Sequence, residues 1–303
     1  MRVVSLLPST TEIVVALGHG DDLVGRSHEC DFPPEVVDLP VITRPRREHV
    51  GTSGEIHRAV VDLLEQVLSI YVVDPPALRA ANPELIITQD LCRVCAVPED
   101  EVVEAARVYL GEGVEVVTSS PTSLGEVFAD VLRIGEALND REAAERLVSR
   151  LQGELNDLAA SVAAMRRPRL ALLEWTDPLM VAGHWTPELI ETAGAAPVLT
   201  SGGRHSPIIT FEALRDSDPD VILVAPCGYD LPRAVAERQV LGGIAGWHDL
   251  TAVREGRVAF ADGSAYFSRP GPRLVTSAAI IAAVTHSFGP AQELEGRAWQ
   301  RWS

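Results

Sequence analysis

Four cysteines lie in segments that are otherwise polar. Cys92 and Cys95 form a Cys-x-x-Cys pair, a spacing typical of metal chelation or redox exchange. Cys30 follows His28 by two residues, and Cys227 follows an apolar run that repeats the run before Cys92. The pattern predicts a metal ion or iron–sulfur cluster on Cys30, Cys92, Cys95 and Cys227. Two alternatives stay open. The thiols could take part in cobalt or thiol chemistry on a bound ligand, or they could only line the wall of a ligand cleft.

Polar loops that also hold aromatic, histidine and arginine side chains recur along the chain. Five of its 15 aromatic residues (Trp 5, Tyr 4, Phe 6) lie in these loops. This favours a flat ligand on which rings stack, while packing against sheet edges is the alternative. The candidate ligand-binding residues are Arg26, His28, Asp90, Glu174, Trp175, His184, Trp185, Tyr229, Tyr266, Phe267, Arg269 and Arg273.

The histidines and arginines of this set suggest different interactions. His28 and His184 are candidate ligands for cobalt or iron as neutral imidazoles, or partners of the carboxylates Glu29 and Asp177. The arginines of segment 263–273, which opens a predicted helix, suit an anionic group.

A pattern of strand and loop occurs once in each half of the chain. Residues 82–88 and 218–224 both contain an Asn-Pro or Asp-Pro turn followed by a short apolar β-branched run, and each leads to a cysteine. Residues 3–7 and 170–174 are matching apolar runs at the start of each half. The repetition predicts two similar α/β lobes with a ligand cleft between them.

The elements that must position the loops alternate between strands and helices. The first lobe has predicted strands at 2–7, 22–25, 85–88 and 115–118, with helices at 51–69 and 99–110. The second has predicted strands at 169–174, 221–224 and 257–261, with helices at 187–193, 232–239 and 271–285. Such alternation predicts parallel sheets with crossover helices, and ligands sit off the carboxyl ends of their strands.

The longest periodic stretch lies between the two copies. Segment 123–138 has one apolar stripe, and segment 140–165 continues it as a helix of about 39 Å. That length is enough to cross from lobe to lobe, although a helix on the surface of one lobe is the alternative. We therefore expect a first lobe at 1–121, a bridging helix within 122–167 and a second lobe at 168–303.

Composition excludes several classes of protein. A chain of 303 residues with 46% hydrophobic residues can bury a sizeable core, and its net charge of −17 argues against nucleic-acid binding. We expect no membrane span, because no apolar run approaches about 20 residues. A strand follows Met1-Arg2 directly, so we expect a cytoplasmic protein, or a periplasmic or extracellular one if a leader was removed.

Several motifs resemble one family of binding proteins. Segments 4–12 with 16–18, 82–86 and 218–222 resemble the two-lobed solute-binding proteins of ABC importers for vitamin B12, haem and ferric siderophores. Residues 31–34, 266–267 and 272–273 look closest to the cobalamin-binding branch. The resemblance implies two Rossmann-like lobes joined by one long interlobe helix. The cysteines and the helix at 51–69 depart from the family pattern, and no glutamate matches a docking motif for the transporter.

These features favour ligand binding over catalysis, because no nucleophile–base pair and no nucleotide-binding motif occurs. The leading hypothesis is a non-catalytic protein that holds a corrinoid, cobalamin-like ligand between the lobes, with an ABC permease as a possible partner. Haem or a ferric siderophore is the alternative ligand. A cysteine-ligated metal or iron–sulfur enzyme and a purely structural metal site are the competing classes.

Overall fold

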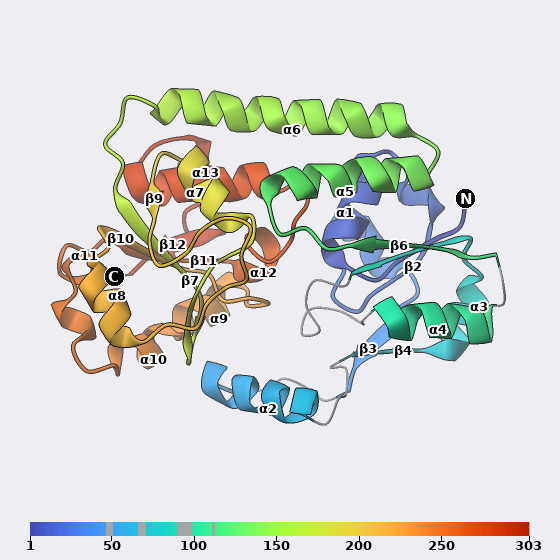
Figure 1. The fold of residues 1–303 in the computed structure, drawn as a ribbon, viewed down its shortest axis with the longest axis horizontal. Coiled ribbons are helices and arrows are strands. Elements are labelled where there is room, and N and C mark those ends of the chain that lie inside the picture. The colour runs from blue at the N-terminus through green and yellow to red at the C-terminus, as the bar shows by residue number, and fades with distance from the viewer. Residues whose placement is uncertain (47–50, 66–70, 90–98, 111–112, 303) are drawn as a thin grey trace. The chain divides into compact units, whose positions relative to one another are not determined.

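The computed structural model describes residues 1–46, 51–65, 71–89, 99–110 and 113–302. The chain divides into two compact α/β units (Figure 1). The first unit comprises residues 1–51, 58–121 and 125–150, and the second comprises 52–57, 122–124 and 151–303.

A four-stranded parallel sheet forms the centre of the first unit. Its strands, in the order β2-β1-β5-β6, are β2 (Leu23–Arg26), β1 (Val3–Ser5), β5 (Leu85–Gln89) and β6 (Glu115–Ser119). All four predicted strands are therefore present. The unit also contains an antiparallel pair of strands, β3 (Thr43–Pro45) and β4 (Tyr71–Val73), which the sequence pattern did not predict.

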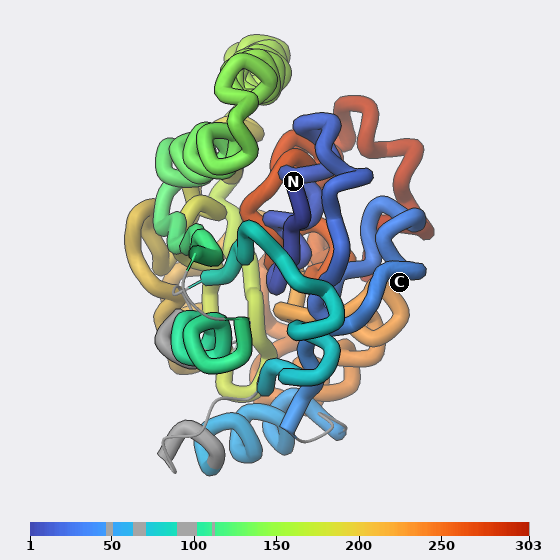
Figure 2. The backbone as a smooth tube through the Cα atoms, turned by 90° about the vertical axis from the view of Figure 1, so that its right-hand side faces the viewer, coloured from blue at the N-terminus to red at the C-terminus, as the bar shows by residue number. Residues whose placement is uncertain are grey.

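Helices and one compact apolar cluster complete the first unit. Its helices include α1 (Pro8–Ala16), α3 (Pro75–Ala81), α4 (Glu99–Tyr109) and all but the first residue of α5 (Leu124–Ala137). Helices α3 and α4 pack side by side (Figure 2). The core cluster joins the sheet to these helices through Val4, Leu6, Ile42, Tyr71, Leu78, Ala81, Ile86, Val102 and Ala106.

The second unit has a larger, mixed sheet. Its strands, in the order β12-β11-β10-β7-β8, are β12 (Trp299–Arg301), β11 (Val258–Ala261), β10 (Val221–Val224), β7 (Arg169–Thr176) and β8 (Leu179–Val181), and β9 (Ala196–Pro197) also pairs with β7. Strands β7, β9, β10 and β11 are parallel, as predicted, while β8 and β12 add antiparallel strands.

The helices of the second unit are short except for one. They are α7 (Thr186–Thr192), α8 (Phe211–Ser217), α9 (Leu231–Ala236), α10 (Arg238–Gly242), α11 (Thr251–Arg254), α12 (Gly263–Tyr266) and α13 (Leu274–His286). Residues 277–285 of α13 are all buried, so this helix belongs to the core. The helix predicted at 271–285 is therefore α13, which begins at Leu274.

The repeated sequence pattern has the same structure in both units. Helices α3 and α8 end at Asn82 and Asp218, whose φ angles of 42° and 39° are left-handed. Asparagine and aspartate tolerate this conformation, and the proline that follows prevents further helix. Each copy also anchors its neighbouring strand, since Glu84 accepts from the Arg2 amide and Asp220 from the Arg169 amide, both at 2.7 Å.

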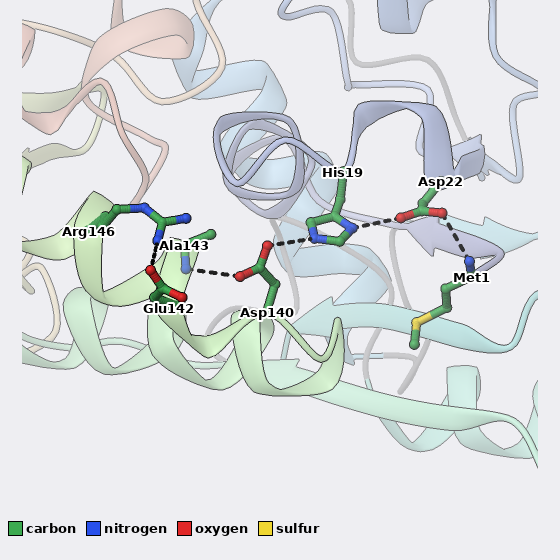
Figure 3. Close-up of polar contacts among 7 residues, drawn as sticks. All are labelled: Met1, His19, Asp22, Asp140, Glu142, Ala143 and Arg146. Carbon is green, nitrogen blue, oxygen red and sulfur yellow. Dashed lines mark hydrogen bonds and ion pairs between the residues drawn. The ribbon is translucent and has the colours of Figure 1, made fainter.

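The chain passes from the first unit to the second for the last time within α6 (Arg141–Val162), which is 22 residues or about 33 Å long. Asp140 caps this helix by accepting from the Ala143 amide at 3.0 Å (Figure 3). His19 places its Nε2 3.4 Å from Asp140 and its Nδ1 2.7 Å from Asp22. Hydrogen bonding to His19 lowers the pKa of Asp22, and the cap lowers the pKa of Asp140. The start of α6 is thus fixed to the first unit.

The described helices include none that is both long and apolar enough to cross a membrane.

Two helical glycines give a test of packing between α5 and α6. A Cβ at Gly135 of α5 would lie 2.4 Å from the Ala144 Cβ of α6, whereas one at Gly153 of α6 would meet nothing within 4 Å. We expect Gly135→Ala to lower the free energy of unfolding by about 1–3 kcal/mol through overpacking. Gly153→Ala should raise it by about 0.5–1 kcal/mol through helix propensity. Urea denaturation of both variants measures the difference, and equal effects would contradict the close α5–α6 packing.

Candidate functional site

Trp175 and Tyr229 meet where β7 and β10 end at the carboxyl edge of the second sheet. Their rings pack edge to face with centroids 5.3 Å apart, and the Arg233 guanidinium lies 3.9 Å from the Tyr229 centroid. Burial raises the pKa of Tyr229, so its phenol is neutral at pH 7. The Trp175 indole N–H donates to the Asp177 carbonyl at 3.0 Å. Since Tyr229 is enclosed and Trp175 is partly exposed, Trp175 is the ring of this pair that a ligand can reach.

The predicted stacking residues differ in exposure. Tyr229 is 3% exposed, Trp185 is 6% exposed and Phe267 is 7% exposed. For these three rings the packing alternative fits the structure better than ligand stacking. Trp175 and Tyr266 keep partial exposure. Near Trp175, the Glu174 carbonyl accepts from the amide of Cys227, which is exposed.

The arginines of segment 263–273 lie beside a carboxylate of the same loop. Arg269 is buried and donates to the Ser264 hydroxyl at 3.2 Å, and Arg273 lies 5.5 Å from the Tyr266 ring centroid. Asp262 caps α12 with its side chain. Burial is the main influence and raises the pKa of Asp262, while the positive charges of Arg269 and Arg273 oppose the shift. These arginines therefore stabilise their own loop in the structure, and their predicted role toward a ligand stays a prediction.

A cavity of about 750 Å³ opens in the second unit. The segment between β9 and α8 supplies most of its wall, including Thr200, Ser201, Gly203, Arg204 and His205. Both Arg204 and His205 are exposed. The cavity thus offers a cationic guanidinium, an imidazole and the three hydroxyls of Thr122, Thr200 and Ser201 to a ligand.

His184 lies edge-on against His205, with ring centroids 5.0 Å apart and planes at 90°. Burial, and next the neighbouring His205, lower the pKa of His184, so it is neutral at pH 7. Its Nδ1 is buried without a hydrogen-bond partner among the described residues. A neutral imidazole has a lone pair, which is what a metal ion requires of a histidine. Of the two histidines predicted as metal ligands, His184 is therefore the one whose imidazole is held neutral.

Backbone contacts hold the cavity wall in place. The His184 amide donates to the Arg204 carbonyl at 2.6 Å, and the Gly203 amide returns a bond to the His184 carbonyl at 3.1 Å. A Cβ at Gly183 would lie 2.4 Å from the Arg204 carbonyl, so only glycine permits this approach. His184 and Leu199 have positive φ angles of 53° and 63°. Such strained conformations often occur at functional sites.

Glu188 connects the same wall to the start of α5. Its carboxylate accepts from the Leu124 amide at 2.6 Å. A Cβ at Gly202 would come within 3.1 Å of the Glu188 side chain. Glu188 therefore positions two parts of the cavity lining. One is Thr122, two residues before Leu124, and the other is the glycine-containing wall.

Arg26 and His28, the predicted site residues of the first unit that the structure describes, bond to nearby segments of the same unit. Arg26 is buried and donates to the carbonyls of Ser27 and Val37 at 3.0 and 2.7 Å. His28 Nδ1 lies 2.8 Å from the Thr43 hydroxyl. His28 Nε2 is 3.7 Å from Glu29, the carboxylate that the sequence offered as its alternative partner. These contacts favour the hydrogen-bonding interpretation of His28 over metal ligation.

The described cysteines have different surroundings. Cys30 is buried against hydroxyls, with Thr11 Oγ1 at 3.1 Å and Ser27 Oγ at 3.2 Å from its sulfur, while Cys227 is exposed. Asp90, Cys92 and Cys95 lie outside the described residues. Among the residues that are described, no group of three or more His, Cys, Asp or Glu side chains is arranged to hold a metal ion. The predicted metal or iron–sulfur site has no support here.

Arg204 and His205 were not among the predicted ligand-binding residues. The signal that could have identified them is the polar, glycine-containing run 200–207, Thr-Ser-Gly-Gly-Arg-His-Ser-Pro. It lies between predicted elements and does not follow either of the repeated strand patterns.

Comparison with proteins of known sequence finds relatives that include vitamin B12-binding proteins. Vitamin B12-binding proteins of Photorhabdus laumondii and Yersinia pestis are each 24% identical to this chain, over 228 and 226 residues. The match covers 74% of this chain and 70% and 69% of theirs.

Solved structures share the whole fold. A periplasmic heme-binding protein from Pseudomonas aeruginosa superimposes with a TM-score of 0.73 at 21% identity, covering 100% of this chain and 98% of its own. The periplasmic vitamin B12-binding protein of Vibrio cholerae has a TM-score of 0.63 at 20% identity, covering 93% and 95%. The predicted fold class, two Rossmann-like lobes with a long interlobe helix, is confirmed by these neighbours. Because the periplasmic binding protein family model also matches residues 3–265, this chain belongs to that family.

Proposed function

We propose that this protein binds a metal-bearing macrocycle, a corrinoid in the first place, and releases it unchanged. The observation that carries the proposal is the exposed His205 on the cavity wall, backed by the neutral His184. Vitamin B12-binding relatives across 74% of the chain support a corrinoid. The candidate site offers groups that bind a ligand.

His205 is the exposed member of the histidine pair and is therefore the candidate donor to a metal that the ligand carries. The His184 ring lies beside it, with ring centroids 5.0 Å apart and perpendicular planes. In this proposal His184 fixes the orientation of the His205 ring.

Haem is the second candidate, and Arg204 is the observation that favours it. Haem carries two carboxylates, whereas the peripheral groups of cobalamin are mostly neutral amides. An exposed guanidinium on the cavity wall is a strong partner for a carboxylate. The heme-binding structural neighbour shares the fold, which is compatible with either ligand.

The relatives favour export. The sequence-based expectation of a cytoplasmic protein finds no support, because the matching family and structural neighbours are periplasmic binding proteins. We infer the alternative location, outside the inner membrane, where the protein would deliver its ligand to an ABC permease. Fractionation of the native cells with an antibody to this chain tests the location.

Titration with aquocobalamin and haemin tests the ligand. Replacing the axial water of either metal by an imidazole changes the visible spectrum, so we expect a saturable spectral change with the wild-type protein. His205→Ala should weaken binding by about 1–3 kcal/mol and remove the spectral change. His248→Ala, an exposed histidine of the same unit outside the cavity wall, is the matched control and should behave as wild type. If neither compound binds the wild-type protein, the proposed ligand class is wrong.

Arg204→Gln separates the two candidate ligands. Loss of the guanidinium should weaken haemin binding by about 1.5–3 kcal/mol, because the carboxylate then loses a charge-assisted bond. Aquocobalamin affinity should change little. Isothermal titration of both ligands with this variant measures the difference, and an equal loss for both would contradict pairing with a carboxylate.

Stability below neutral pH tests the neutral state of His184. Its pKa is lowered in the folded protein, so at acidic pH the unfolded chain binds a proton that the folded protein does not. The free energy of unfolding should therefore fall as the pH drops through the ordinary histidine value near 6.5. The decrease should be smaller in His184→Gln, as measured by urea denaturation between pH 7.5 and 5.5. An unchanged pH dependence in the variant would contradict a lowered pKa.

A further inference from the structure

The first turn of α2 (Ser53–Glu65) is fixed by side chains that the candidate site does not use. Thr52 and Glu55 form a reciprocal N-cap, in which Glu55 accepts from the Thr52 amide at 2.8 Å and Thr52 Oγ1 accepts from the Glu55 amide at 3.3 Å. Residues 52–57 belong to the second unit, although the chain before and directly after them belongs to the first. This turn is therefore part of the second unit's structure.

A buried chain of hydroxyls ends on a carboxylate at this turn. Ser53, Thr176 and Glu237 are 0%, 2% and 6% exposed. Thr176 donates to the Glu237 carboxylate, and the hydroxyl oxygens of Thr176 and Ser53 are 2.9 Å apart. A hydroxyl has one proton, so the Thr176 hydroxyl, which is placed to donate to both Ser53 and Glu237, donates to one of them at a time.

This chain lies at the carboxyl edge of the second sheet. Thr176 is the last residue of β7 and follows Trp175, whose ring contacts Tyr229. Glu237 directly follows α9, which carries Arg233 over the same tyrosine. Ligands of parallel α/β sheets bind off this edge. The first turn of α2 therefore covers part of the edge where Trp175 is available.

We infer that residues 52–57 form a releasable cap over this edge, held by the Ser53–Thr176–Glu237 chain, and that the cap slows the departure of bound ligand. The inference about departure rests on the proposed function and requires that the ligand held at the cavity wall extend to Trp175. A polar chain suits a releasable contact, because its hydroxyls exchange protein partners for water at a small net cost. Ile56 is the buried apolar residue of the turn.

Hydrogen exchange in the ligand-free protein tests the cap directly. The Ile56 amide donates to the Thr52 carbonyl at 3.0 Å, so its exchange reports opening of this turn. Ser53→Ala removes only the link from α2 and keeps the Thr52–Glu55 N-cap. Thr176→Val removes the central hydroxyl at nearly constant shape. We expect each variant to speed exchange at Ile56 roughly tenfold, the effect of losing one hydrogen bond.

The double variant and a matched control make this result specific. Ser53→Ala with Thr176→Val should exchange no faster than the faster single variant, because both act on one chain. Thr285→Val changes a buried threonine of the same unit whose hydroxyl has no hydrogen-bond partner among the described residues, and it should leave Ile56 exchange unchanged. The cap hypothesis would be wrong if Ile56 exchanged at the wild-type rate in both Ser53→Ala and Thr176→Val. It would also be wrong if the effects of the two substitutions on the exchange rate multiplied in the double variant.

The dissociation rate of the probe ligands tests whether the cap slows the departure of bound ligand. Stopped-flow displacement of aquocobalamin or haemin should be about tenfold faster in Ser53→Ala than in wild type, with little change in Thr285→Val. Faster exchange at Ile56 with an unchanged dissociation rate would overturn a role in retention. If neither probe binds wild type, the proposed function and the role in retention both fail, while the exchange result still decides whether the cap exists.

Discussion

The pairing of β1 with β5 and of β7 with β10 is the constraint on which both units depend. In each case a left-handed cap ends a helix, a proline prevents its continuation, and the next carboxylate accepts from the backbone of the neighbouring strand. These contacts fix the register of a parallel pair at its amino end. Because parallel strands share one direction, fixing that end also decides which loops gather at the opposite, carboxyl edge.

The loops at this edge satisfy most of their polar groups internally. Arg26 bonds to carbonyls, Asp262 caps a helix beside two arginines, and Glu237 accepts a hydroxyl. A buried polar group without a partner is costly, so loops with many polar residues fold into networks of their own. Residue type alone therefore does not distinguish a ligand-binding arginine from one that holds its loop.

The histidine pair differs from these networks. The imidazole of His184 is partly buried, kept neutral and unpartnered at Nδ1, while His205 is exposed on the cavity wall. Close backbone contacts at Gly183 and the positive φ of His184 hold the pair in position. A rigid wall lowers the entropy that a ligand must remove on binding. This arrangement is the part of the second unit to which we assign the proposed ligand.

The sequence by itself determined the order and type of the main elements, because apolar periodicity and turn residues act locally. Residues 85–88 and 221–224 were predicted as buried strands and are β5 and β10, and the repeated Pro turns marked where they start. Only the tertiary structure decided which side chains meet. It paired His184 with His205, 21 positions away, and Ser53 with Thr176, 123 positions away. It also enclosed Trp185 and Tyr229, since burial depends on which segments cover a ring, and that is a property of packing between distant parts of the chain.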